Sequence, residues 1–565
     1  MSASAEAVIT AGSRPELFAE FGARAVNGRL LIIALVLLTL GGFALRVTGL
    51  SVEALSEDEL NKLNAVADYR AHGLTGANGE HPLLMKALQT VCLVAAEEWN
   101  NNSFVQERPA SLSIPVEAAL RFPSVVFGAL TTLLLYLLAA ELFGSEVALI
   151  AAALWAFDPN VVGFNRIAKE DTFLLFFFLL ANVFWLRSQR AAETGRERPV
   201  YYWATAASLG ALAASKYVPQ YFAISICYYH IFQGVPAVRW RLGKRRFLIF
   251  FAIVGTVFVL CNPTILLPDT WRQMFAFVSY KRIGHDGFEF MGTIYSHKLM
   301  DWLKGVPWYF YFVFMGVKLP TLTLAAFFTG LPQLFRRKLG DGRFFLFFWT
   351  LLGLVPYIFV GGKFTRYFAP MMPVVLITAG IGVQWAGRIF AGKLGALSDD
   401  DGFKSYARAA LALIVILASL WATVRAAPHY RLYTNLIGGG TARAGYYFPQ
   451  DDFYDAYLRE VMRGIAGRAR PGARVASETP TLTAYYAHQV NRPDLVCVLL
   501  SDPAALKELG AGDFIIAARG RRYFSNDALV SRLRQEATPA FRVSLGEVPA
   551  AEVYILDEAT LAIIK

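Results

Sequence analysis

Long apolar runs limit the folds open to this chain more than any other feature of its sequence. Residues 30–49, 119–141 and 368–388 carry few charges, and roughly 20 apolar residues are enough for a helix to cross a bilayer. The chain of 565 residues is 56% hydrophobic and 17% charged, whereas soluble proteins carry about 25% charged residues. The pattern therefore predicts a mainly α-helical, polytopic membrane protein.

About eleven membrane spans are expected along the sequence. The first follows a polar tail, is long, and has no small-residue cleavage site after it, so we expect a retained helix and not a removed signal peptide. The fifth and sixth are short and lie close together. The expected spans are residues 30–49, 119–141, 145–162, 170–187, 201–216, 218–234, 246–262, 307–331, 344–361, 368–388 and 408–426.

The basic residues indicate how these spans are oriented. Lys and Arg cluster in four short loops, and with eleven spans all four loops fall on one side. Cytoplasmic loops are enriched in Lys and Arg, so this side is expected to be the cytoplasm. The same pattern accounts for the net charge of +11 without a nucleic-acid partner. The four clusters lie at residues 187–198, 239–246, 336–338 and 388–408.

This orientation predicts three parts. Residues 1–29 form a cytoplasmic tail, residues 30–427 form the membrane domain, and residues 428–565 lie outside the cytoplasm. The outer face also receives the loops 50–118 and 263–306. Within the first loop, 58–72 and 83–99 have the length and pattern of helices lying in the interface plane.

The last part of the chain differs in composition from the rest. It is mixed and charged, with a helical stretch at 453–464 and several short β-like runs. Alternating helix and strand signals are typical of a small α/β domain. The β-like runs lie at residues 474–477, 495–500, 513–517 and 552–556.

An acidic pair, Asp58 and Glu59, follows the first span on the expected outer side. Acidic residues are favoured in the first turn of a helix, so the pair could be a solvated helix N-terminus. A carboxylate at the membrane surface could also act as a general base on a hydroxyl group. Repulsion from the preceding Glu57 could raise a pKa in the pair. The pair alone leaves both interpretations open.

A second polar cluster, Glu80, His81 and Lys86, brackets the start of the second interfacial helix. A His before Pro is commonly a capping or packing residue. Helix N-termini with nearby cations also bind phosphate, and Glu80 with His81 could hold a divalent metal ion. Two ligands are too few to define a metal site from their spacing.

Cations gather on the expected outer face, where the bias toward cytoplasmic Lys and Arg does not predict them. A single cation near a membrane edge is usually an anchor, but an anionic lipid headgroup would explain the collection. Asp171 lies with Lys169 and Glu170 directly before an apolar run, and charges at such depth are usually paired or functional. The cations are Lys86, Arg166, Lys169, Lys216, Lys363 and Arg366.

Two further candidates lie near these cations. Tyr367 directly follows Arg366, and His285 lies in the outer loop 263–306. His285 could bind an acceptor or a lipid, or it could be an ordinary loop residue.

The ordered series of motifs resembles the GT-C glycosyltransferases of the protein O-mannosyltransferase and lipid A aminoarabinose transferase group. The resemblance covers roughly residues 30–445. It departs from the family at Leu83, where the family motif has a second proline. The chain has no room for the extra sugar-binding-like module of eukaryotic mannosyltransferases, so it is similar to a bacterial member. The motifs are Asp58-Glu59, Glu80-His81-Pro82-Leu83, Leu120-Arg121-Phe122-Pro123-Ser124, Asn165-Arg166-Ile167-Ala168, Lys216, Lys363 to Pro370 and Tyr433-Thr434-Asn435.

The resemblance implies transfer of a sugar from a polyprenyl-phosphate donor on the outer face of the bacterial cytoplasmic membrane. Asp58 would be the catalytic base, Glu59 would assist it, and the anomeric configuration would invert. Glu80 and His81 would lie near the donor phosphate or a metal ion. Lys216 and Arg366 would neutralise the phosphate, since positive groups stabilise charge that develops on a leaving oxygen. The acceptor could be a protein, a lipid or a glycan, and no cofactor is firmly implied.

Two other function classes stay open at this point. A transporter or flippase of lipid-linked sugars usually places ionisable groups at the bilayer midplane and often shows inverted repeats. Here the charges gather at one face and no repeat is visible. A non-catalytic envelope assembly protein would use the outer α/β domain to bind a partner. That domain carries no readable motif, so the sequence does not exclude this class.

Overall fold

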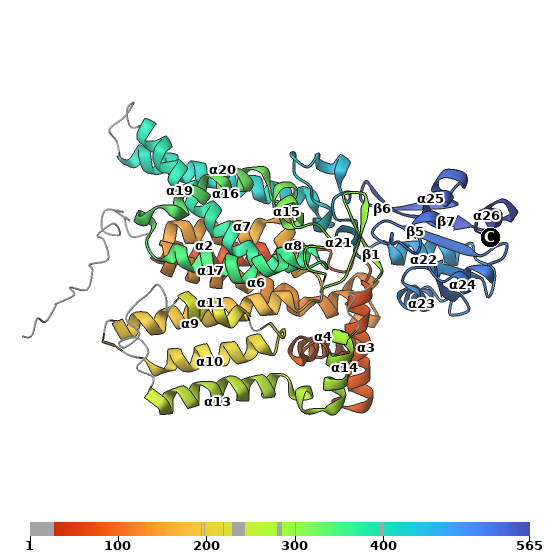
Figure 1. Cartoon of the computed structure of the whole chain (residues 1–565), viewed down its shortest axis with the longest axis horizontal. Helices are drawn as coiled ribbons and strands as arrows, with labels where there is room; N and C mark the ends of the chain where they lie inside the picture. Colours follow the sequence, from red (N-terminus) through yellow and green to blue (C-terminus); the bar gives the residue numbers. More distant parts are fainter. Residues whose placement is uncertain are drawn as a thin grey trace, which may run out of the picture.

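A long body of helices and a smaller domain containing a β-sheet make up the molecule (Figure 1). The computed structural model describes residues 28–193, 195–196, 198–218, 220–228, 243–279, 285–299, 301–394 and 401–564. The expected tail 1–29 lies outside these residues except for its last two. Parts of the expected span 218–234 and of the basic loop 239–246 also lie outside them. The predicted mainly helical architecture with a small C-terminal sheet domain is confirmed.

The helical body contains the elements expected as spans. Its longer helices run side by side along the horizontal axis of Figure 1. They are α2 (Gly28–Val47), α6 (Val116–Phe143), α7 (Ser145–Phe157), α9 (Asp171–Glu193), α10 (Pro199–Ala213), α13 (Gly243–Cys261), α17 (Gly342–Gly353), α19 (Met372–Leu394) and α20 (Asp401–Ala426). Shorter elements are α8 (Pro159–Asn165), α11 (Gln220–Cys227), α15 (Phe310–Lys318), α16 (Thr321–Gly330) and α18 (Val355–Phe359).

Six of the described helical segments are long and apolar enough to cross a membrane, or seven if the bent pair α7 and α8 counts as one span. The bend between α7 and α8 is 63°. The other expected spans coincide with shorter apolar helices, among them α10, α11 and the pair α15 and α16. The chain is therefore a membrane protein, and the count of eleven spans stays a prediction.

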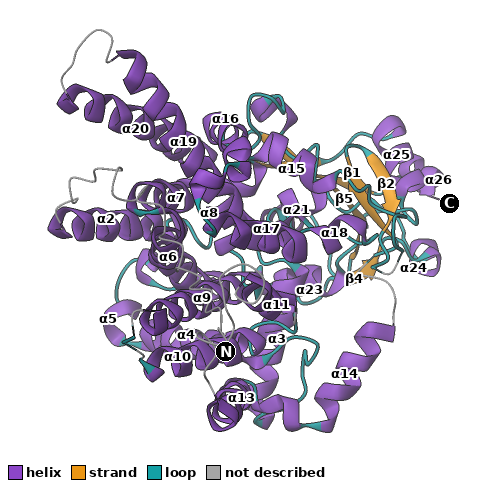
Figure 2. Cartoon of the chain, turned by 60° about the vertical axis from the view of Figure 1, so that its left-hand side comes forward, coloured by secondary structure: helices purple, strands orange, loops and turns teal. Residues whose placement is uncertain are grey.

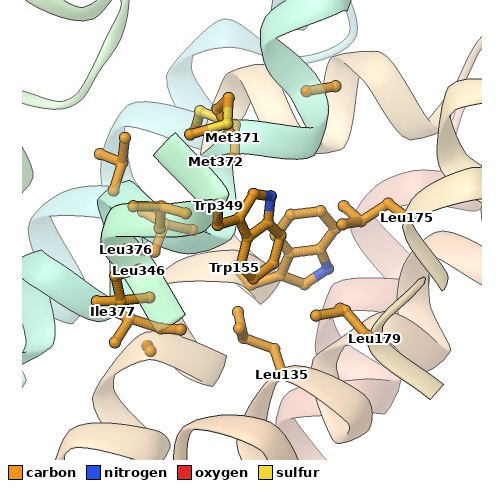
Figure 3. Close-up of a cluster of buried hydrophobic side chains, with 14 of the residues drawn as sticks. Leu135, Trp155, Leu175, Leu179, Leu346, Trp349, Met371, Met372, Leu376 and Ile377 are labelled. Carbon is orange, nitrogen blue, oxygen red and sulfur yellow. The ribbon is translucent and has the colours of Figure 1, made fainter. Parts of the chain in front are cut away.

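Small residues allow the helices of the body to approach closely. A Cβ atom added to Gly382 of α19 would lie 1.9 Å from the carbonyl oxygen of Ala326 in α16, and one added to Gly330 would lie 1.9 Å from that of Thr378. Helices in membranes commonly pack through such small residues. Beside this contact lies a large buried cluster in which Trp155 of α7 and Trp349 of α17 are surrounded by Leu and Met side chains (Figure 3).

Three helices lie at the end of the body that faces the sheet domain. They are α3 (Glu57–His72), α4 (Leu83–Asn101) and α14 (Pro268–Ser279). In Figure 1, α3 runs across the direction of the long helices. The two helices expected at 58–72 and 83–99 are thus present. A capping box at Ser56 and Glu59 starts α3, because each side chain accepts a hydrogen bond from the other residue's backbone N–H.

The C-terminal domain is built on a five-stranded mixed sheet with the strand order β4-β3-β5-β7-β6. Strands β3, β4 and β5 are parallel, and β7 pairs with both β5 and β6 in the antiparallel sense. Figure 2 shows these strands gathered at one end of the molecule. The strands are β3 (Arg474–Ser477), β4 (Val496–Leu499), β5 (Phe514–Ala518), β6 (Phe541–Leu545) and β7 (Val548–Ile555).

The four expected β-like runs correspond to β3, β4, β5 and β7, whereas β6 was not expected. It is a short edge strand in which partly buried apolar side chains alternate with exposed polar ones from Phe541 to Ser544, and this alternation is a signal that could have indicated it. The expected helix 453–464 begins later, as α22 (Leu458–Ala466), after the short α21 (Pro449–Phe453). The remaining helices of this domain are α23 (Pro480–Gln489), α24 (Pro503–Lys507), α25 (Asp527–Glu536) and α26 (Glu558–Ile564).

Candidate active site

Asp58 lies in the first turn of α3 at the junction between the helical body and the C-terminal domain. Its Oδ2 atom lies 2.7 Å from Lys169 Nζ and 3.4 Å from a guanidinium nitrogen of Arg366. The hydroxyl of Tyr454 donates a hydrogen bond of 2.8 Å to the same oxygen. The loop before α9, the segment before α19 and the C-terminal part of the chain thus meet at one carboxylate.

The Asp58 side chain is 36% exposed, whereas those of Lys169 and Arg366 are 5% and 12% exposed. Burial raises the pKa of this carboxyl group, but the charge of Lys169 and then that of Arg366 outweigh it. The pKa of Asp58 is therefore well below its usual value. At neutral pH the residue is an ionised carboxylate that is open to solvent on one side.

Glu59 has a different environment from its neighbour, because its side chain is fully buried. Its two oxygens accept hydrogen bonds of 2.8 and 2.7 Å from Arg121, and Oε1 also accepts one from the N–H of Ala168. Arg121 donates further to the carbonyl groups of Leu50, Glu53 and Ala54. This geometry favours a positioning role for Glu59 over direct contact with a substrate.

A second row of charges continues along α3 from Asp58. Lys62 Nζ lies 2.9 Å from Glu170 Oε1, and His81 Nδ1 lies 3.5 Å from the same oxygen. Burial lowers the pKa of His81 well below its usual value, against the nearby charge of Glu170. Lys62 was not a sequence candidate. Its position at i+4 from Asp58, one turn along the same face, is the signal that could have found it.

Lys216 and Asp171 form the other side of the site. Lys216 Nζ lies 2.6 Å from Asp171 Oδ1 and 5.1 Å from the centre of the Tyr367 ring. The Arg366 guanidinium lies 5.7 Å from that ring. The ring of Tyr367 therefore connects this ion pair to the surroundings of Asp58.

Three of the cations predicted to bind phosphate donate their hydrogen bonds to backbone carbonyl groups instead. Lys86 donates to the carbonyls of residues 77, 78 and 81, and Lys363 to those of residues 306 and 360. Arg166 donates to carbonyls at the end of α2 and just after it. All three side chains are nearly buried. This placement argues against their predicted role in phosphate binding and gives each of them a structural one.

The predicted metal pair does not converge on a common point. Glu80 accepts a hydrogen bond of 2.6 Å from the Asn78 amide, whereas the His81 ring faces Glu170. No group of three metal-binding side chains occurs among the described residues. Glu80 instead lines an open polar groove of about 440 Å³ together with side chains of α3 and α14. The donor set thus does not fit a metal ion held by Glu80 and His81.

His285 lies at the contact with the C-terminal domain and not beside Asp58. Its ring stacks on Tyr523 with a centroid distance of 4.1 Å. Its Nε2 atom lies 2.9 Å from Arg521 and 3.5 Å from Glu57. Because Glu57 precedes Asp58, His285 is at most an indirect neighbour of the carboxylate.

Sequence reasoning missed the contribution of the C-terminal segment to this site. Besides Tyr454, Asp451 lies 3.6 Å from Arg366 and accepts a hydrogen bond from the N–H of Thr365. Tyr454 is 396 residues away from Asp58 in the chain. No local pattern links positions so far apart, so only the tertiary structure could reveal the contact.

One family model matches part of the chain. Residues 104–266 match the family described as Dolichyl-phosphate-mannose-protein mannosyltransferase. This match confirms the predicted resemblance to GT-C glycosyltransferases. The matched segment contains Lys169, Asp171 and Lys216, but it begins after Asp58. No curated protein matches the chain significantly.

Several solved membrane glycosyltransferases are similar to the chain in structure. ArnT from Cupriavidus metallidurans bound to undecaprenyl phosphate is 14% identical, with 94% of this chain and 98% of that chain covered and a TM-score of 0.47. The oligosaccharyltransferase AglB from Archaeoglobus fulgidus is 11% identical, with 90% and 71% covered and a TM-score of 0.48. The Pmt1-Pmt2 complex of S. cerevisiae is 19% identical, with 44% and 33% covered and a TM-score of 0.28.

Proposed function

We propose that the protein transfers a sugar from a polyprenyl-phosphate donor to an acceptor hydroxyl, with Asp58 as the general base. The observation that carries this proposal is the Asp58 carboxylate, which is 36% exposed and is held by Lys169, Arg366 and Tyr454. The reaction takes place on the outer face of the cytoplasmic membrane. The C-terminal domain lies on that face and orients the acceptor, and the N-terminus is cytoplasmic.

The reaction needs one base and a positive site for the leaving group. Asp58 takes the proton of the acceptor hydroxyl as that oxygen forms a bond to the anomeric carbon. The bond between the anomeric carbon and the phosphate oxygen breaks, and polyprenyl phosphate leaves with the electron pair. Because the acceptor attacks the face opposite the leaving group, the anomeric configuration inverts.

The cations around Asp58 are suited to the developing phosphate charge. Lys216 and Arg366 both lie near the ring of Tyr367, 5.1 and 5.7 Å from its centre, and have partly exposed side chains. Preorganised positive groups act mainly by stabilising charge in the transition state. A phosphate between them would place the leaving oxygen beside the aromatic ring and close to the carboxylate.

Donor binding would also overcome a difficulty with Asp58 as the base. A carboxylate with a very low pKa is a weak proton acceptor, and Lys169 and Arg366 hold the pKa of Asp58 low in the free protein. A donor phosphate that draws Arg366 toward itself would reduce the positive charge at Asp58. The pKa of Asp58 would then rise, so that donor binding would strengthen the base when it is needed.

The proposal is tested with the purified protein in proteoliposomes that contain undecaprenyl-phosphate mannose, and with other undecaprenyl-phosphate sugars as parallel donors. A cell-envelope extract supplies protein, lipid and glycan acceptors. We expect release of undecaprenyl phosphate and appearance of the sugar on one acceptor class with inverted anomeric configuration. Movement of the intact lipid-linked sugar across the membrane, without release of undecaprenyl phosphate from any donor, would identify a flippase instead.

A further inference from the structure

The turn at Tyr454 and Asp455 has an uncommon backbone conformation. Two consecutive residues other than glycine have positive φ angles there, 44° at Tyr454 and 60° at Asp455. Asp tolerates the left-handed region because its short side chain can bond locally, but a bulky residue such as Tyr rarely adopts it. Such conformations persist only where the surrounding structure holds them, and they often occur at functional sites.

The side chain of Asp455 supplies that support. It is buried and accepts two hydrogen bonds from Arg521, one of them 2.7 Å long at Nε. It also accepts a hydrogen bond of 3.2 Å from the backbone N–H of Glu57, the first residue of α3. Arg521 follows strand β5, so one ion pair connects the sheet domain, the turn and the start of α3.

The turn and α3 are joined through the backbone as well. The N–H of Ala54, just before α3, donates a hydrogen bond of 3.1 Å to the carbonyl oxygen of Ala456. The two segments thus contact each other at the two residues that directly follow Tyr454. This arrangement fixes the direction in which the Tyr454 side chain leaves the turn.

That direction brings the Tyr454 hydroxyl to Asp58. The hydroxyl donates 2.8 Å to Oδ2, the oxygen that also faces Lys169 and Arg366. The Arg431 guanidinium lies 4.9 Å from the centre of the Tyr454 ring. Among the described residues, these three contacts of the carboxylate are all made through Oδ2, so Oδ1 is the oxygen that would take the proton of an acceptor hydroxyl.

We propose that Tyr454 is a positioning residue of the transfer reaction and that Arg521 and Asp455 of the C-terminal part hold it against Asp58. This inference rests on the proposed function and goes beyond it in one respect. The C-terminal domain completes the catalytic site, in addition to orienting the acceptor. If the turn were released from Arg521, Asp58 would still be present, but Tyr454 would no longer orient its carboxylate.

The first test replaces only the hydroxyl, with Tyr454→Phe, which keeps the ring beside Arg431. We expect kcat/KM for the undecaprenyl-phosphate donor to fall roughly tenfold or more, as for the loss of one hydrogen bond to a charged group. A hydrogen bond to the charged form lowers a pKa, so the acidic limb of the pH profile should move to higher pH. Tyr446→Phe is the matched control, since that hydroxyl bonds only the carbonyl of Met291 among the contacts of the described residues.

A second readout does not depend on transfer. Dicyclohexylcarbodiimide modifies protonated carboxyl groups, and mass spectrometry gives the labelling rate at Asp58. At a fixed pH above the pKa, each tenfold rise in the protonated fraction gives a tenfold rise in this rate. We expect faster labelling in Tyr454→Phe and no change in Tyr446→Phe. If the wild-type protein transfers no sugar, the proposed function fails, but the labelling still tests the turn.

The coupling to the C-terminal domain is tested with Arg521→Gln and, in case that variant folds poorly, with Asp455→Asn. Neither residue touches Asp58, yet each should accelerate labelling as Tyr454→Phe does. Combining either change with Tyr454→Phe should increase the labelling rate little further, because the effects of substitutions that act through one contact are not additive. Unchanged Asp58 labelling in Tyr454→Phe, or fully additive effects in the double variant, would overturn the inference.

Discussion

Asp58 and Glu59 are adjacent in the chain, but their carboxylates bind different cations on different sides of α3. Asp58 lies 2.7 Å from Lys169 and is 36% exposed, whereas Glu59 lies 2.7 Å from Arg121 and is fully buried. A one-residue step on a helix turns the side chain by about 100°, which is enough to separate the two. Asp58 can therefore contact a substrate, whereas Glu59 stabilises the fold.

This division predicts a loss of stability, and not a specific loss of chemistry, for Glu59→Gln. Removing one charge of a buried pair leaves the other uncompensated and costs about 3 kcal/mol or more. Thermal unfolding of the variant in detergent should shift strongly to lower temperature. The matched control is Glu97→Gln, because Glu97 forms the same two-pronged pair with Arg70 at the surface.

The control should change the unfolding temperature little, since exposed pairs contribute little. A Glu59→Gln protein as stable as the wild type, but inactive, would contradict the scaffold role. It would return Glu59 to the catalytic role that the family resemblance implies.

The pH dependence of transfer should change when Lys169 is replaced. Lys169 is the first charge that lowers the pKa of Asp58, so Lys169→Met should raise that pKa. The acidic limb of kcat/KM should then move to higher pH, while Lys169→Arg, which keeps the charge, should move it much less. An acidic limb at the same pH in Lys169→Met would show that another group controls it.

Donor binding should distinguish Lys216 from Lys86. Lys216 is partly exposed beside Asp171 and Tyr367, so Lys216→Gln should raise the KM for undecaprenyl-phosphate mannose about tenfold, as for one lost charged hydrogen bond. Lys216→Arg should recover much of the affinity. Steady-state kinetics at varied donor concentration measures both.

Lys86→Gln provides the contrast, because Lys86 binds three backbone carbonyl groups. That variant should lower the unfolding temperature and leave the KM of the folded fraction unchanged. A raised donor KM in Lys86→Gln, with normal stability, would favour the phosphate role that the sequence predicted for it.

The helices and the sheet of the molecule could largely be predicted from local patterns. Apolar runs indicated α2 and α6 within about three residues of their observed bounds, and α9, α19 and α20 within about seven. Short β-like runs indicated four of the five strands of the C-terminal sheet. These signals lie within a few residues of each other, so they do not depend on how the chain folds back on itself.

The composition of the site could be predicted less well, for a physical reason. Lys86, Arg166 and Lys363 looked the same as Lys216 and Arg366 in the sequence, because all five are cations near apolar spans. What separates them is whether a carbonyl group or a carboxylate lies opposite, and distant segments decide that. Asp58 was found from its place after the first span, whereas its partner Tyr454 gave no local signal at a separation of 396 residues.

The measurement that tests the central claim most directly is release of undecaprenyl phosphate by Asp58→Asn. The change keeps the size of the side chain and removes its ability to accept a proton. Asp68→Asn is the matched control, because Asp68 lies on the same helix and bonds only His72 and Thr75 among its described contacts. We predict that Asp58→Asn folds, still binds undecaprenyl phosphate and loses at least about 100-fold in kcat, as for a lost general base, while Asp68→Asn keeps wild-type activity. Full transfer by Asp58→Asn would contradict the account.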